Sequence, residues 1–114
     1  MNTTSAVVAK VMGNALSVKI CGEIDHHTVR SARREIDAQI YATRPKKLVI
    51  DLSEMLFMDS SGLGLIVGRV ASAKEVGATV ELIEVSPRAL RIFEMAGLFR
   101  AEGLTIHRTK GKED

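Results

Sequence analysis

The sequence has little cysteine, few aromatic residues and no large excess of charge of either sign. Its 114 residues include one cysteine, one tyrosine, three phenylalanines and no tryptophan. A single thiol, Cys21, excludes an internal disulfide and a zinc site made of cysteine thiolates. We expect Cys21 to be a small core residue, because it follows the apolar run 16–20. The shortage of aromatic rings disfavours a surface that binds RNA by base stacking.

Charge and hydropathy disfavour two further classes of protein. The formal net charge is +2, from 16 basic and 14 acidic residues, which is too small a surplus for a phosphate-binding surface. Glu35 and Asp37 interrupt the main basic region, which we interpret as a solvated helix face. Its members are Arg30, Arg33, Arg34, Arg44, Lys46 and Lys47. The longest apolar run, 63–67, is too short to span a bilayer, and residues 1–6 carry no signal region. We therefore expect a cytoplasmic protein that binds neither nucleic acid nor a membrane.

Five segments have the composition of β-strands, and they lie at residues 7–11, 16–20, 47–52, 79–85 and 104–107. The first two alternate between apolar and polar positions around Gly13-Asn14, which predicts a hairpin of two half-buried strands. The third contains consecutive β-branched residues, which predicts a strand buried on both faces, as in a parallel sheet. The last is expected to be a short edge strand.

Three segments place apolar residues at helical spacing, and they lie at residues 29–40, 63–73 and 87–96. Asp25 or Thr28 can cap the first helix, and Arg44-Pro45 ends it. Gly77 closes the second helix, while Ser86 and Pro87 open the third, which stops at Gly97. Apolar residues beyond the main stripe of the third helix fit either a partner groove or a helix that is buried all round.

The element order β-β-α-β-α-β-α-(β) predicts one α/β domain over residues 1–114. Strands that alternate with helices imply a mixed sheet with right-handed parallel crossovers. The charged tail 110–114 is expected to be frayed.

The segment Met58–Gly64 follows the central strand and leads into the second helix, a place where sites gather in open α/β sheets. One interpretation is structural: Asp59, Ser60 or Ser61 caps the helix, and the glycines allow close packing. Gly64 and Gly68, four residues apart, are interpreted in the same way. The other interpretation is a serine that accepts a phosphate. A helix N-terminus tolerates the phosphate, but its charge of about −1.5 to −2 would repel a partner docked on the neutral loop.

Signals for catalysis and for metal binding are weak. The Gly-x-Ser-x-Gly elbow of hydrolases is absent, and a base for Ser60 would have to be one of the three histidines, His26, His27 or His107. The segment 23–27 contains metal-ligand residue types, but adjacent histidines rarely point to one ion. We interpret it as a loop that caps the first helix or binds a partner. We therefore predict a protein that is not an enzyme and has no metal or cofactor.

Three segments carry a resemblance to a known family: Gly22–Thr28, Phe57–Gly64 and Phe93–Phe99. With them, residues 5–107 resemble a bacterial anti-sigma-factor antagonist, a stand-alone STAS domain. The motif Asp-Ser-Ser-Gly-Leu-Gly at 59–64 is the most specific part. The stretch Asp-His-His-Thr at 25–28 favours the sporulation type.

The resemblance implies a mixed sheet with helices mainly on one side, and a partner switch. In this family the unphosphorylated antagonist binds an anti-sigma factor that is also a serine kinase, and thereby releases a sigma factor. The kinase then phosphorylates the first serine after the aspartate, which is Ser60 here, and a serine phosphatase resets the protein. The partner-binding residues that the resemblance implies are Glu23, Asp25, His26, Met58, Asp59, Ser61, Gly62 and Leu63. We expect a monomer in the free state; the alternative is a non-switching scaffold subunit of a stress-signalling or lipid-transport complex.

Overall fold

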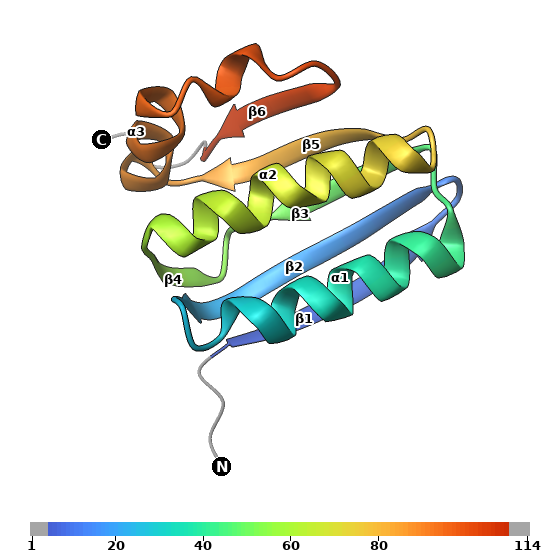
Figure 1. The fold of residues 1–114 in the computed structure, drawn as a ribbon, viewed down its shortest axis with the longest axis horizontal. Helices are drawn as coiled ribbons and strands as arrows, with labels where there is room; N and C mark the ends of the chain where they lie inside the picture. The colour runs from blue at the N-terminus through green and yellow to red at the C-terminus, as the bar shows by residue number, and fades with distance from the viewer. Residues whose placement is uncertain (1–4, 110–114) are drawn as a thin grey trace.

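The chain, in a computed structural model that describes residues 5–109, forms one mixed sheet with three helices (Figure 1). The strands are β1 (Ser5–Met12), β2 (Ala15–Ile24), β3 (Lys47–Asp51), β4 (Met55–Met58), β5 (Thr79–Val85) and β6 (Leu104–Arg108). The helices are α1 (Val29–Thr43), α2 (Ser60–Glu75) and α3 (Pro87–Met95), followed by a 3₁₀ turn at Leu98–Arg100. The predicted order is confirmed, with one added strand, β4. The tail predicted at 110–114 lies outside the described residues.

The sheet has the order β1-β2-β3-β5-β6, and β4 pairs with β2. β1 and β2 form the predicted antiparallel hairpin, whereas all other pairs are parallel. The first half of β2 pairs with β3, from Ala15 to Lys19. The second half pairs with β4, after a register shift at Gly22/Glu23. The two halves of β2 therefore have different neighbours, and only the second half reaches the region where α1 and α2 begin.

The helices lie on one face of the sheet (Figure 1). On that face β2 buries Leu16, Val18 and Ile20, as the alternating pattern predicts. On the opposite face Val49 and Cys21 stay half-exposed. Two predictions are therefore wrong: β3 is not buried on both faces, and Cys21 is not a core residue. β3 lies at the centre of the sheet, but only the face that carries the helices is covered there.

The helices pack on the sheet mainly through the stripes that the spacing predicts. In α1 the buried residues are Ala32, Ile36 and Ile40. In α3 the ring of Phe93 is fully buried, which contributes about 2 to 3 kcal/mol. Met95, in contrast, is 84% exposed, which excludes one of the two alternatives for the third helix, a helix buried all round.

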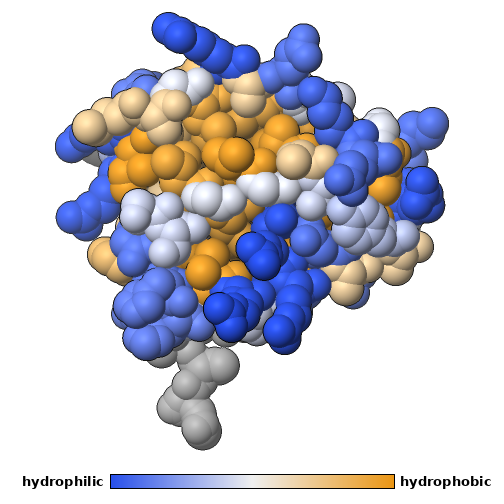
Figure 2. All heavy atoms as spheres, in the orientation of Figure 1, coloured by the Kyte–Doolittle hydropathy of each residue, from blue (hydrophilic) through white to orange (hydrophobic). Residues whose placement is uncertain are grey.

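The buried face of the second helix is rotated from the predicted apolar stripe, because Leu65 and the cation Arg69 are buried while Val67 is exposed. Figure 2 shows the face of the molecule that carries α1 and α2. Hydrophilic side chains gather in the lower part of this view, where α1 lies. No helix among the described residues is long and apolar enough to span a membrane.

The helix ends follow the local chemistry of the sequence. Ser86 Oγ accepts a hydrogen bond from the Ala89 amide at 3.2 Å, with Pro87 as the first helical residue. Gly77 follows α2 with a φ of 80°, a left-handed conformation that glycine adopts without strain. These predicted boundaries are confirmed. Arg44 takes the left-handed conformation after α1, with a φ of 45°.

Candidate functional site

Pairing of β2 with β4 brings together the two segments that the sequence singles out. Glu23 lies opposite Phe57 and Ile24 lies opposite Met58. The Asp59 amide then donates to the Ile24 carbonyl at 3.2 Å. As a result, the start of α1 and the start of α2 lie side by side at one end of the sheet. The predicted loop over 23–27 is wrong for its first two residues, because Glu23 and Ile24 belong to β2. The sequence gives no sign of β4, which forms through pairing with β2 and not through a pattern of its own.

Asp59 caps the N-terminus of α2. Its Oδ1 accepts a hydrogen bond from the Ser61 amide at 2.7 Å, and its carbonyl accepts one from the Gly62 amide at 2.9 Å. Ser60 is the first helical residue and is exposed, whereas Ser61 is half-buried. The capping interpretation is thus confirmed for Asp59. Among the described residues Ser60 makes no side-chain hydrogen bond, so its hydroxyl is free for another use.

Gly62 allows the loop to close against the helix. A Cβ placed on Gly62 would overlap Cγ and Sδ of Met58. Met58 is 7% exposed and Gly62 is buried, so these two predicted partner-binding residues lie beneath the surface and shape it. Gly64 and Gly68 differ, because a Cβ at either position would meet no atom within 4 Å. The close-packing interpretation is correct for Gly62 and wrong for Gly64 and Gly68.

The segment before α1 is held by its own side chains. Asp25 Oδ1 accepts hydrogen bonds from the amides of His27 at 2.9 Å and Thr28 at 3.1 Å. Thr28 Oγ1 accepts from the Asp25 amide at 3.0 Å and donates to the Glu23 carbonyl at 2.9 Å. The His27 amide, followed by Thr28, lowers the pKa of the Asp25 carboxyl. Glu23, His26 and His27 are exposed at the surface of this ordered turn.

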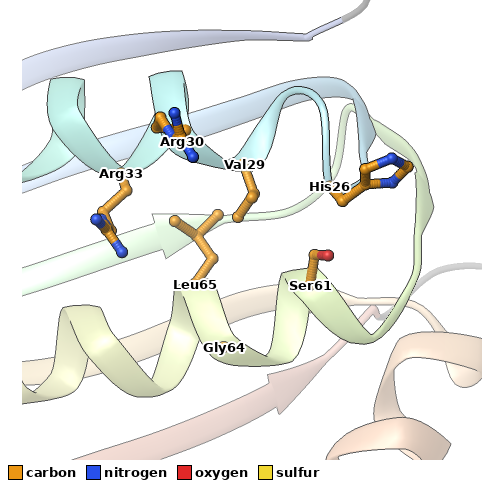
Figure 3. Close-up of a pocket in the computed structure, with 7 residues that line it drawn as sticks. All are labelled: His26, Val29, Arg30, Arg33, Ser61, Gly64 and Leu65. Carbon is orange, nitrogen blue, oxygen red and sulfur yellow. The ribbon is translucent and has the colours of Figure 1, made fainter.

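A depression of about 360 Å³ lies between α1 and α2, next to Ser61 (Figure 3). His26 lies at its end nearest the loops, and Val29 and Leu65 face each other between the helices (Figure 3). Its complete lining is His26, Val29, Arg30, Arg33, Ser61, Gly64 and Leu65. The arginines of α1 are exposed to solvent, as the sequence predicts, but no pattern in the sequence indicates the depression. The spacing of Arg30 and Arg33 puts them on neighbouring turns of one helix face, and Gly64 leaves room opposite them.

Two exposed apolar side chains lie close to Ser60 in the sequence. Leu56 is 80% exposed and Phe57 is 46% exposed, both on β4 only three to four residues before Ser60. Exposed apolar side chains that gather beside a polar loop are typical of surfaces that bind another protein.

The STAS domain family matches residues 6–112, and the chain belongs to this family. Among curated proteins it is similar to the anti-sigma F factor antagonist of Paenibacillus polymyxa, with 38% identity over 85 residues that cover 75% of this chain and 73% of that protein. It is also similar to the anti-sigma-B factor antagonist of Bacillus subtilis, with 34% identity over 85 residues that cover 75% of this chain and 76% of that protein.

Solved structures support the same fold. The anti-sigma factor antagonist SpoIIAA in its unphosphorylated form superposes with a TM-score of 0.73 at 26% identity, covering 89% of this chain and 87% of that one. The Bacillus cell fate determinant SpoIIAA in the phosphorylated form gives a TM-score of 0.68 at 27% identity, with 89% and 90% covered. The predicted mixed sheet with helices mainly on one side is therefore confirmed as a STAS fold.

Proposed function

We propose that this protein is an anti-sigma factor antagonist that switches partners by phosphorylation of Ser60. In the unphosphorylated form it binds an anti-sigma factor with serine kinase activity, so that a sigma factor is released. The observation that carries this proposal is the position of Ser60: an exposed hydroxyl at the start of α2, in the motif that resembles the antagonists, just after β4 where it pairs with the end of β2. The protein acts in the cytoplasm as a binding module and kinase substrate, not as an enzyme.

The position of Ser60 suits a phosphate that blocks binding without unfolding the protein. The hydroxyl is exposed, so a kinase can reach it. Helix amides and the helix dipole tolerate an anion at this end. Asp59 already carries a negative charge on the cap, and a phosphate adds about −1.5 to −2 more. A partner surface that fits the neutral hydroxyl would then face a bulky, strongly negative group.

The docking surface that we propose surrounds Ser60 and includes the end of β2, the turn before α1 and the start of α2. Exposed or half-exposed residues that can contact the anti-sigma factor are Glu23, Asp25, His26, Asp59, Ser61 and Leu63. Met58 and Gly62 are buried and act indirectly, because their packing against each other fixes the position of residues 58–62. A serine phosphatase reverses the modification, and the free protein is a monomer.

Affinity capture from the native lysate tests this function with two baits, Ser60→Ala and Ser60→Asp. We expect the first bait to retain an anti-sigma factor with kinase activity and the second to lose it. Ser53→Asp is the matched control, since Ser53 is also exposed but lies in the turn after β3; it should capture the same partner as the unmodified protein. Identical partners on both Ser60 baits, without a kinase, would instead support the scaffold alternative.

A further inference from the structure

The depression between α1 and α2 contains positive charge that the chain itself does not neutralise. Arg30 and Arg33 line it from α1, and none of its described lining residues is acidic. Within residues 5–109, the ion pairs are Lys47 with Glu81 and Arg69 with Asp37, so neither lining arginine has a carboxylate partner. Asp37, one helical turn beyond Arg33, is 2.9 Å from Arg69 and is thus already engaged.

The depression is also open and continuous with the proposed docking surface. Ser61 lines it and directly follows Ser60 in the chain. Gly64 lines it from the next turn of α2, and no side chain fills the space beside that glycine. His26, from the loop before α1, lies at the end nearest Ser61 (Figure 3). Arg33 points from α1 toward α2, and Arg30 lines the depression beside it on α1 (Figure 3). A group that enters the depression therefore meets cationic side chains and a half-exposed hydroxyl.

We propose that this depression receives a carboxylate side chain of the anti-sigma factor, which Arg30 and Arg33 bind. The inference rests on the proposed function and specifies the chemistry of the partner at this site. A guanidinium binds a carboxylate through two parallel hydrogen bonds, which gives both strength and a fixed direction. Because both arginines are on the first two turns of α1, the contact fixes how the partner lies across α1 and α2.

The two arginines also connect binding of the partner to phosphorylation of Ser60. A phosphate on Ser60 would place a strong anion one residue from Ser61, at the edge of the same depression. It would compete with the partner's carboxylate for the two arginines. Binding would thus be lost both by repulsion at the loop and by competition for the cations.

The test uses this protein and the anti-sigma factor captured by the Ser60→Ala bait, both purified. Affinity is measured by calorimetry for wild type, Arg30→Glu and Arg33→Glu. Arg34→Glu is the matched control, because it makes the same charge change on the same helix at an exposed position outside the depression. We expect each lining variant to bind about tenfold or more weakly, and the control to stay within about threefold of wild type. Circular dichroism confirms that the variants are folded.

A charge swap then identifies the carboxylate. Acidic residues of the anti-sigma factor are changed one at a time to lysine and tested against Arg33→Glu. One such variant should restore at least part of the lost affinity. Equal effects of Arg30→Glu, Arg33→Glu and Arg34→Glu, or the absence of any rescue, would overturn the inference while leaving the proposed function intact. Failure to capture any anti-sigma factor would overturn both.

Discussion

The carboxylate of Asp59 accepts a hydrogen bond of 2.7 Å from the Ser61 amide. Asp59 therefore caps α2 one residue before the exposed Ser60. The cap leaves the Ser60 hydroxyl without a structural task among the described contacts. The helix cap and the proposed phosphorylation site are therefore on adjacent residues. Ser60 can be modified without loss of the cap that begins the helix.

Asp59 should stabilise the fold through this cap. We expect Asp59→Ala to lower the free energy of unfolding by about 1 kcal/mol, because it removes the side-chain acceptor. Asp59→Asn keeps an acceptor oxygen and should cost less. Urea denaturation of both variants measures the difference. Equal losses for alanine and asparagine would mean that the charge, and not the hydrogen bond, is what matters.

Arg69 joins α2 to α1 through an ion pair with Asp37. Arg69 is 4% exposed, and its Nε lies 2.9 Å from Asp37 Oδ1. Neither atom has a hydrogen-bond partner of acceptable geometry among the described residues, so the contact is electrostatic. Burial lowers the pKa of Arg69, while the charge of Asp37 opposes that shift.

Removing Asp37 should therefore leave a buried, uncompensated cation. We expect Asp37→Leu to destabilise by about 2 to 3 kcal/mol, which is less than for a fully buried pair because Asp37 keeps some contact with water. Arg69→Met leaves the partly hydrated carboxylate instead, and should cost less. Urea unfolding of the two variants provides the comparison. A milder effect from Asp37→Leu than from Arg69→Met would contradict this account.

The glycines of α2 should differ from the glycine that follows it. Gly64 and Gly68 have open space where a Cβ would lie, so alanine at each position should stabilise by about 0.5 to 1 kcal/mol. Gly77 has a φ of 80°, so Gly77→Ala should destabilise by about 1 kcal/mol. Thermal unfolding of the three single variants shows directly whether each substitution stabilises or destabilises the fold. Loss of stability in Gly64→Ala would indicate packing that the structure does not contain.

Acid should weaken the turn before α1. The amides of His27 and Thr28 favour the ionised form of Asp25, so the pKa of this carboxyl lies below its ordinary value of 3.8. A lowered pKa stabilises the folded state above pH 3.8, and this contribution is lost as the pH falls through the lowered pKa. The stability difference between wild type and Asp25→Asn should thus be present at neutral pH and vanish in strong acid. A pKa of Asp25 at or above 3.8, measured by NMR titration, would refute the stabilising role of these hydrogen bonds.

Local chemistry made several parts of the fold predictable. The strand Thr79–Val85 and the Ser86-Pro87 helix start depend on neighbouring residues only, and both are confirmed. β4 could not be predicted, since four residues owe their conformation to pairing with the distant end of β2. The sequence also did not reveal that one face of the sheet is uncovered. The apolar run in β3 is typical of a strand buried on both faces, yet Val49 is half-exposed.

The site was predictable in its residues but not in its shape. The motif around Ser60 can be found in the sequence, and so can the turn at Asp25. Their contact through the Asp59 amide and the Ile24 carbonyl depends on strand pairing. Arg30 and Arg33 look like part of a solvated helix face, and only the packing of α1 beside α2 turns that face into the wall of a depression.

The most direct test of the central claim compares one partner with two chemical states of Ser60. The chain is phosphorylated by the captured anti-sigma factor with ATP, the modified residue is mapped by mass spectrometry, and the affinities of both forms are measured. We predict a phosphate on Ser60 alone, and binding to the phosphorylated form at least about a hundredfold weaker, or about 2.7 kcal/mol. A phosphate at another residue, or equal affinity of both forms, would contradict the account.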